Sequence, residues 1–550
     1  MASLLPYCLS SRGSRKERKR WKQIEAAASQ LHTLPSWTSP ITNRLIFQAF
    51  EWHIPADGQH WVRLRHALRG LTAIGVDTLW LPPGCKGMDP NGNGYDIYDL
   101  YDLGEFEQKG SRRTKFGTRE ELEALVTEAK AIGVRLIWDA VLNHKAGADR
   151  VERCEAVKVD DERRNVEIST PRTINAWVGF DFPGRDDRYS SMKYHGQHFS
   201  GVDWDDKTKE NALYRLLHPD RSGWAPDVSD EKGNYDYLMF ADLDLSHPEV
   251  REDLLNWGTW ITRELSLGGM RLDAAKHMST TFQKAFVEHV RKTTSNPELF
   301  FVGEYWSESL RDLIQYLEDV QYKLAAYDVP LVGNFSRASR TRGADLRRIF
   351  DGTLVSEKSA HAVTIVMNHD TQPGQMMDTP IAPSFKLLAY ALILLRKEGN
   401  PCLFYGDLYG IHASAKHPTI PAACDGKLPI LARARRHFAY GEQQDYFDAP
   451  NCVGFVRYGN ACHPSGLACL MSNAGRATKR MYVGPGHSNE VWTDILRPQC
   501  ARTQVTVDER GYAEFSVHAG SVSVWVESKA GAAAELESVS DDFALDIYGS

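Results

Sequence analysis

An arginine and an aspartate two residues apart form the most chemically suggestive pattern in this chain. Arg271 and Asp273 follow the glycines Gly268 and Gly269 and lie in a short apolar run. Alternate side chains of a strand point to the same face, so these two would lie side by side. A guanidinium keeps a neighbouring carboxylate ionised and oriented, as a nucleophilic or charge-stabilising aspartate requires. A salt bridge at the end of a strand has the same pattern, so the pair alone does not decide between the two.

Three further apolar runs end in polar residues suited to acid–base chemistry. One run ends in Asn143 and His144, another in Glu304, and a third in His369 and Asp370. If the runs are parallel strands of a closed barrel, their carboxyl ends share one rim, which is where barrel enzymes place their chemistry. Three carboxylates and two histidines on one rim exceed what the fold alone requires. The pattern predicts nucleophilic or general acid–base catalysis.

The surrounding sequence alternates strands with helices. The segment Thr118-Arg119-Glu120-Glu121 is a capping box, apolar residues follow on one helical stripe, and Gly133 ends that helix. Continuous apolar strands between helices indicate parallel β/α units. Eight such strands are predicted, at residues 44–52, 76–81, 134–139, 270–273, 299–302, 325–329, 362–366 and 402–404. This number predicts the α/β class and a closed (β/α)8 TIM barrel.

Two segments depart from this alternation. Residues 145–238 are polar and rich in glycine and tyrosine, which predicts an excursion domain B inserted after the third barrel strand. From about residue 440 apolar and polar residues alternate between turns, which predicts a C-terminal all-β sandwich. The predicted organisation begins with a basic N-terminal extension at 1–41, which has a helical pattern at 16–31. The catalytic barrel (domain A) covers 42–144 and 239–439, and domain B covers 145–238. A β-sandwich (domain C) at 440–528 and an acidic tail at 529–550 follow.

Composition narrows the partners and the location. The chain has 550 residues, 42% of them hydrophobic, and a net charge of -7, which argues against nucleic acid as its main partner. The sequence has no run of about 18 apolar residues, so it predicts no membrane span. Nine cysteines without a CxxC motif indicate reduced thiols. Leu4–Leu9 is too short for the core of a signal peptide. We therefore expect a cytoplasmic protein and a monomer.

The motifs together resemble a known family. In order and spacing, residues 139–144, 270–277, 302–306 and 366–370 are similar to the four conserved regions of the α-amylase family of glycoside hydrolases (family 13). The resemblance covers roughly residues 42–527. It extends through 94–106, 233–239 and 368–375, which look most like the liquefying bacterial α-amylases and their intracellular fungal relatives.

The resemblance implies a role for each motif residue. Retaining glycoside hydrolysis uses a carboxylate nucleophile and a carboxylic acid about 5–5.5 Å apart. These would be Asp273 and Glu304, with Asp370 favouring the transition state. His144 and His369 would donate to the sugar at the central subsite. The full set of substrate-binding residues implied is Tyr95, His144, Arg271, Lys276, His277, Trp306 and His369.

The resemblance also implies one structural Ca²⁺ between the barrel and domain B. Ca²⁺ prefers six to eight oxygen ligands. The matching positions are Asn143, Asp236, Asp242 and the backbone carbonyl of His277. Additional ions are doubtful, because Ala225 and Ser246 stand where liquefying relatives carry carboxylates.

Three functions remain open on the sequence. The first is endo-hydrolysis of internal α-1,4-glucosidic bonds in starch, glycogen or maltooligosaccharides through a covalent glycosyl-enzyme. The second is a 4-α-glucanotransferase that acts on intracellular α-glucan with the same residues. The third is a catalytically silent glucan-binding or scaffold protein, against which the intact Asp273, Glu304 and Asp370 argue.

Overall fold

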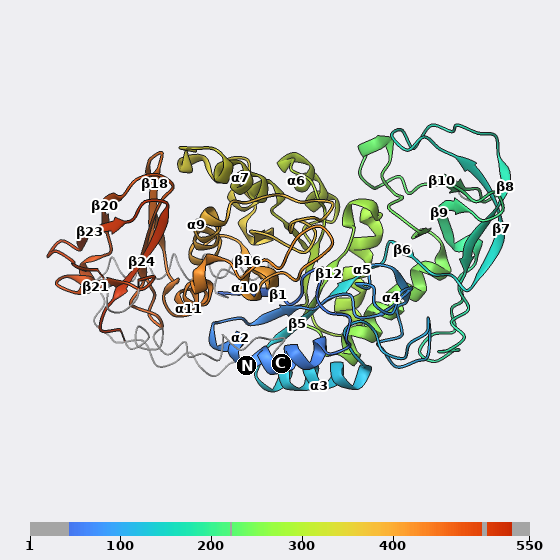
Figure 1. Cartoon of the computed structure of the whole chain (residues 1–550), viewed down its shortest axis with the longest axis horizontal. Coiled ribbons are helices and arrows are strands. Elements are labelled where there is room, and N and C mark those ends of the chain that lie inside the picture. Colours follow the sequence, from blue (N-terminus) through green and yellow to red (C-terminus); the bar gives the residue numbers. More distant parts are fainter. Residues whose placement is uncertain (1–42, 220–222, 498–502, 531–550) are drawn as a thin grey trace. The chain divides into compact units, whose positions relative to one another are not determined.

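The computed structural model describes residues 43–219, 223–497 and 503–530 (Figure 1). The predicted N-terminal extension, with its helical pattern at 16–31, lies outside the described residues, as does the acidic tail from residue 531 onward. The boundaries of the predicted domains stay a prediction.

Eight parallel strands close into a barrel, as the sequence predicts. They pair around the ring in the order β1-β16-β15-β14-β13-β12-β5-β2. The register of β12 sets Arg271 opposite Asp139 on β5 and opposite Val302 on β13. The barrel strands are β1 (Ile46–Gln48), β2 (Thr78–Trp80), β5 (Arg135–Ala140), β12 (Gly269–Leu272), β13 (Phe300–Gly303), β14 (Ala325–Tyr327), β15 (Ala362–Ile365) and β16 (Asn400–Phe404).

Helices follow the barrel strands and begin at recognisable caps. The predicted capping box is present, because the Thr118 and Glu121 side chains each bond to the other's backbone N–H. Side chains of Ser279, Ser309 and Asp328 cap three later helices. The helices are α2 (His60–Ala73), α3 (Arg119–Ala131), α4 (Pro248–Glu264), α5 (Thr280–Thr293), α6 (Leu310–Asp319), α7 (Val329–Arg340), α8 (Leu354–Glu357), α9 (Pro383–Leu395), α10 (Tyr405–Tyr409) and α11 (Leu428–Phe438).

A six-stranded sheet interrupts the barrel after β5. Its order is β6-β11-β9-β10-β7-β8, and most of it is coloured in teal shades in Figure 1. Only three residues separate the end of β5 from the edge strand β6, which pairs with β11. The point where the chain leaves the barrel therefore lies beside the point where it returns. The strands are β6 (His144–Lys145), β7 (Arg150–Lys158), β8 (Arg172–Gly179), β9 (Phe199–Asp205), β10 (Glu210–Leu216) and β11 (Ala241–Leu243).

The C-terminal part is all-β, as predicted, and appears in red shades in Figure 1. Trp492, Phe515 and Trp525 pack together in its core. Its strands β19 and β24 contact α9, which explains why α9 is apolar and buried along almost its whole length. The strands are β17 (Gln443–Ala449), β18 (Cys452–Arg457), β19 (Leu467–Ser472), β20 (Ala477–Tyr482), β21 (Val491–Asp494), β22 (Gln504–Thr506), β23 (Tyr512–Val517) and β24 (Ser521–Glu527).

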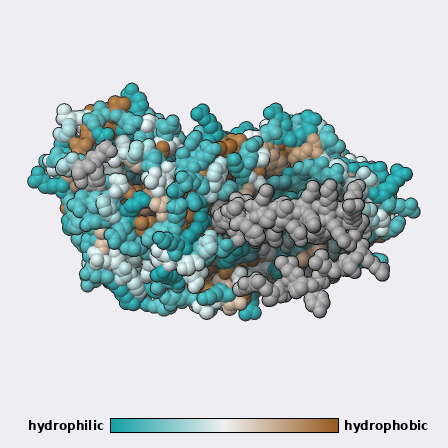
Figure 2. Space-filling model, turned by 180° about the vertical axis from the view of Figure 1, so that it is seen from behind, coloured by the Kyte–Doolittle hydropathy of each residue, from teal (hydrophilic) through white to brown (hydrophobic). Residues whose placement is uncertain are grey.

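The face of the molecule seen in Figure 2 is mainly polar. On the face in Figure 2, hydrophilic side chains dominate the coloured area and hydrophobic ones are scattered. Among the described residues, no helix has the length and apolar character needed to cross a membrane. The described cysteines are all free thiols, namely Cys85, Cys154, Cys402, Cys424, Cys452, Cys462 and Cys469.

Candidate active site

A single buried guanidinium organises the carboxyl rim of the barrel. Arg271 is fully buried, and its Nη1 donates to Oδ1 of Asp273 and to Oδ1 of Asp139, both at 2.7 Å. Its Nη2 is in ion-pair contact with Oε1 of Glu304 at 2.5 Å. Because one side chain touches Asp273 and Glu304, these two predicted catalytic residues lie on the same side of the molecule and beside each other.

A strained backbone turn orients Glu304. Ala274 adopts a left-handed conformation with φ of 52°, which is unfavourable for a residue with a Cβ. The turn directs the backbone N–H of Ala274 to Oε2 of Glu304 at 3.2 Å. Strain of this kind persists only where surrounding contacts impose it. Here those contacts tie the loop after Asp273 to the carboxylate of Glu304.

Burial sets the protonation of these carboxyl groups. Burial raises the pKa of Asp273 to about 6, against the opposing effect of Arg271. Burial also raises the pKa of Glu304, which Arg271 lowers and Asp273 raises further. The charged form of a buried carboxyl is disfavoured, and a nearby cation partly restores it. The cluster can therefore hold one carboxyl ionised and another protonated near neutral pH.

Aromatic rings surround His369 beside the carboxylates. The rings of Tyr95 and His369 are parallel, with centroids 5.2 Å apart, and Trp52 stacks on both with centroids at 5.9 Å. The Tyr95 hydroxyl donates to Oδ2 of Asp139 at 3.0 Å, so its ring position is fixed. Parallel rings beside carboxylates are a suitable surface for a sugar ring.

Asp370 projects from the same rim and is partly open to solvent. Its side chain is 22% exposed, and its Oδ2 lies 3.1 Å from Nε2 of His369. Burial raises its pKa well above the usual value, and repulsion from Glu304 adds to this effect. Three predicted catalytic carboxyls are therefore electrostatically linked in one place.

His144 lies at the same rim, at the start of β6. Its Nε2 donates to the backbone carbonyl of Tyr95 at 2.8 Å, and burial lowers its pKa to about 4. Its Nδ1 is buried and has no hydrogen-bond partner among the described residues. In this neutral ring the remaining polar atom is an acceptor, so the donor role that the resemblance implies would require the Tyr95 bond to break.

Lys276, His277 and Trp306 form a second group next to Asp273 and Glu304. The Lys276 ammonium is paired with Glu231 and lies 3.3 Å from the backbone oxygen of Trp306. Nδ1 of His277 donates to the backbone oxygen of Tyr235 at 2.7 Å. The sequence did not indicate the pairing with Glu231, which comes from the excursion segment.

A separate group of carboxylates lies where the excursion sheet joins the barrel. Asp242 on β11 is fully buried, and its two oxygens accept from Nδ2 of Asn143 at 2.9 Å and from the Ser200 hydroxyl. Burial raises the pKa of Asp236 to about 7, and burial together with Asp236 raises that of Asp242 further. The charged neighbours that most raise the pKa of these two groups are other carboxylates. This oxygen-rich and negatively charged donor set fits a hard divalent cation.

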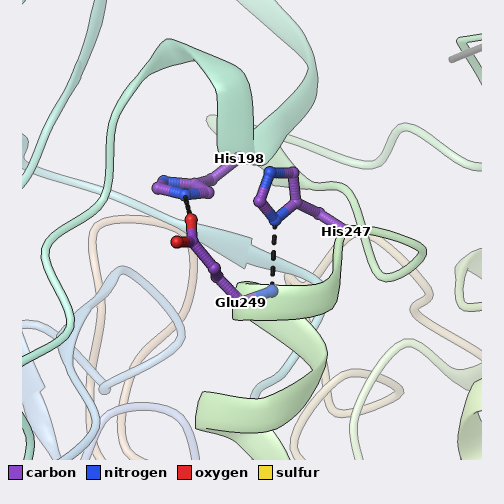
Figure 3. Close-up of side chains that lie close together, drawn as sticks. All are labelled: His198, His247 and Glu249. Atoms are coloured by element: carbon purple, nitrogen blue, oxygen red, sulfur yellow. Dashed lines mark hydrogen bonds and ion pairs between the residues drawn. The ribbon is translucent and has the colours of Figure 1, made fainter. Parts of the chain in front are cut away.

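His198, His247 and Glu249 form a second cluster of metal-ligand residue types, with ligand atoms within 4.8 Å of one another (Figure 3). Nδ1 of His198 accepts from the backbone N–H of His195 at 2.9 Å, and Nδ1 of His247 accepts from that of Glu249 at 3.3 Å. A neutral imidazole has one nitrogen lone pair, which can either accept a hydrogen bond or bind a metal. His198 then donates its Nε2–H to Glu249 at 2.8 Å. As arranged, the cluster caps α4 and does not present two free nitrogen ligands.

Several site residues were missed by the sequence reasoning. Asp139 and Trp80 contact each other, with the indole N–H donating to Oδ2 at 2.9 Å, and Gln48 contacts His369. The available signal was a polar residue within an otherwise apolar strand, as for Asp139 and Gln48. Such residues cost free energy when buried unless they are hydrogen-bonded or functional.

Comparisons with known proteins identify the family of the chain and support its fold. A closed (β/α)8 barrel with carboxylates at the carboxyl ends of its strands is typical of barrel enzymes. The family model "Alpha amylase, catalytic domain" matches residues 64–428. The chain is 44% identical over 487 residues to the glucan 1,4-alpha-maltohexaosidase of Bacillus sp. (strain 707), spanning 88% of this chain and 92% of that protein. It is 39% identical over 492 residues to the cytoplasmic alpha-amylase of Escherichia coli (strain K12), spanning 88% and 99%.

The chain belongs to the α-amylase family of glycoside hydrolases. A crystal structure of an Anoxybacillus alpha-amylase shares the fold, with a TM-score of 0.58 and 17% identity over 89% of this chain and 98% of that one. At this identity the likeness concerns the fold alone.

Proposed function

We propose that this enzyme hydrolyses internal α-1,4-glucosidic bonds of starch, glycogen or maltooligosaccharides with retention of configuration. The observation that supports this most is the contact of one guanidinium with both Asp273 and Glu304. This contact supports a pairing of a carboxylate that would attack with a carboxyl that would donate a proton, the two groups that retaining hydrolysis uses. The relatives named alpha-amylase and maltohexaosidase support α-1,4-glucan as the substrate.

The proposed reaction has two steps. In the first, an oxygen of Asp273 bonds to the anomeric carbon while the bond to the leaving oxygen breaks, and Glu304 gives its proton to that oxygen. In the second, Glu304 takes a proton from water, and the water oxygen displaces Asp273 from the anomeric carbon. Asp370 would bind sugar hydroxyls, together with Tyr95, His144 and His369. Arg271 would keep Asp273 ionised, and Lys276, His277 and Trp306 would contact the sugars beyond the cleaved bond.

We also propose one structural Ca²⁺ at the junction of the barrel and the excursion sheet. Asn143, Asp236, Asp242 and the backbone carbonyl of His277 would hold it. A bound cation there would neutralise the buried carboxylates and join the two parts of the chain. Further ions at this junction are not proposed, because Ala225 and Ser246 supply no carboxylate there.

The enzyme is proposed to act as a monomer in the cytoplasm. The composition of the chain and the relative named cytoplasmic alpha-amylase support the location.

Products from maltoheptaose test the proposal. We expect reducing ends to increase and shorter maltooligosaccharides to accumulate, with the α-anomer formed first in proton NMR spectra. Chains longer than maltoheptaose without a net gain of reducing ends would establish the glucanotransferase instead. An initial β-anomer would exclude retention, and no change at all would support a binding protein.

A further inference from the structure

The ring of His369 has a distinct partner at each nitrogen. Its Nδ1 lies 3.0 Å from Nε2 of Gln48, and its Nε2 lies 3.1 Å from Oδ2 of Asp370. The ring is 1% exposed and is enclosed by aromatic side chains, with the Phe50 centroid at 5.0 Å and the Trp80 centroid at 5.8 Å. It therefore cannot exchange its partners by rotating into solvent.

These partners allow only one placement of the ring proton. Burial lowers the pKa of His369 well below its usual value, and Arg271 lowers it further, so the ring is neutral and carries a single N–H. An amide nitrogen donates and does not accept. Nδ1 is therefore the acceptor, and Nε2 carries the proton toward Asp370. The opposite amide orientation would put the proton on Nδ1 and turn the Nε2 lone pair toward Asp370, an arrangement that is repulsive when Asp370 is ionised.

We propose that Gln48 is a positioning residue that holds His369 in the Nε2–H tautomer, so that His369 presents a hydrogen-bond donor to Asp370 and to the substrate hydroxyl. The inference rests on the proposed function, in which His369 and Asp370 bind the sugar at the cleavage point. Gln48 does this without touching the substrate itself. The hydrogen bond that it makes to one nitrogen determines what the other nitrogen can do.

The position of Gln48 in the barrel supports a dedicated role. It is the last residue of β1 and 1% exposed, and it pairs in register with Trp80 and Phe404. A buried amide among such neighbours is costly unless its hydrogen bonds are made. His144 reaches the same tautomer by another route, because its Nε2–H donates to a backbone carbonyl. Only His369 depends on a side chain that can be replaced.

The sharpest test reverses the polarity of that side chain. Gln48→Glu keeps the shape but replaces the donor by a carboxylate, which accepts from Nδ1–H, so a ring that stays neutral has no proton left for Nε2. We expect kcat on maltoheptaose to fall by about 100-fold, with KM changed by no more than about threefold, because a wrong tautomer weakens the transition state more than ground-state binding. The same exchange at the exposed Gln444, Gln444→Glu, is the matched control and should leave both constants unchanged.

A second variant keeps the test decisive if the buried carboxylate prevents folding. Gln48→Met removes the donor without adding charge, so His369 can adopt either tautomer, and kcat should fall by about tenfold. Nitrogen-15 NMR of enzyme labelled at histidine reports the tautomer directly, with His369 assigned by its absence in His369→Asn. Wild type should show the proton on Nε2, and Gln48→Met a mixture of the two tautomers.

Two results would overturn the inference. One is a proton on Nδ1 of His369 in the wild-type spectrum. The other is a folded Gln48→Met enzyme whose kcat stays within about twofold of wild type. The NMR result does not depend on the reaction proposed above: a wild-type enzyme that fails to cleave maltoheptaose would refute the proposed function, while the spectrum still decides the tautomer.

Discussion

The active-site rim and the junction with the excursion sheet both bury several carboxylates, but they balance this charge differently. At the rim, the guanidinium of Arg271 contacts Asp139, Asp273 and Glu304. At the junction, the charged neighbours of Asp236 and Asp242 are other carboxylates. The rim has a permanent counter-charge built into β12, whereas at the junction Asp242 accepts from the neutral side chains of Asn143 and Ser200.

The roles proposed for the two clusters account for this difference. A catalytic carboxyl must change its protonation or bonding during turnover, so its counter-charge must stay in place, and an arginine is always protonated. Carboxylates that join two parts of a chain need not react, so an exchangeable cation can neutralise them. The following predictions test this distinction, beginning with the largest expected effect.

Removing the guanidinium should damage the rim most. Arg271→Met leaves three buried carboxyls without their counter-ion, and breaking a buried ion pair costs about 3–5 kcal/mol. We expect the free energy of unfolding in urea to fall by about that amount and activity to be lost. Arg311→Met, at an exposed position on α6, is the control and should change neither. A loss below about 1 kcal/mol would contradict the central role of Arg271.

Removing the proton donor should abolish turnover but not binding. Glu304→Gln keeps the shape of the side chain, and the loss of general acid catalysis should lower kcat by about 10³-fold. Binding of maltoheptaose, measured by titration calorimetry, should remain. Glu308→Gln in the following loop is the matched control, because Glu308 is exposed and pairs with Arg337. A Glu304→Gln enzyme with most of its activity would refute the assignment.

Chelation should destabilise the junction and not the rim. A ligand at 100 times its Kd stabilises the folded state by about 2.7 kcal/mol, so a chelator should lower Tm by several degrees. In Asp242→Asn the difference between Tm with calcium and Tm with chelator should shrink, because one charged ligand is gone. Asp273→Asn should respond to chelator as wild type does. A Tm that is indifferent to chelator in wild type would remove the calcium proposal.

The smallest effect concerns pH. Burial raises the pKa of Asp273 to about 6. A nucleophile must be ionised, so kcat/KM should decline below about pH 6 and fall about tenfold per unit at lower pH. At higher pH, Glu304 should lose the proton that it donates, and kcat/KM should fall again. Asp242→Asn should leave the acid limb in place, since Asp242 belongs to the other cluster. An acid limb that is flat down to pH 4 would contradict the role of Asp273.

Much of the fold was predictable because its signals are local. A continuous apolar run such as 134–139 predicts a buried parallel strand from its own residues, and Thr118 with Glu121 predicts a helix start from four residues. The eight strands and the all-β C-terminal part follow from such patterns. The fold places the residues of the four motifs together, because parallel strands of one barrel end on one rim.

The contacts that give each residue its role could not be predicted in this way. Gln48 and His369 are 321 positions apart and meet only because the barrel closes between β1 and β16. Asp139 reaches Arg271 through the register of β5 and β12. The pKa of a carboxyl and the tautomer of a histidine depend on burial and on every neighbouring charge and donor. Residue types and their order thus define the chemistry available to this chain, and the packing of distant segments decides which atom carries the proton.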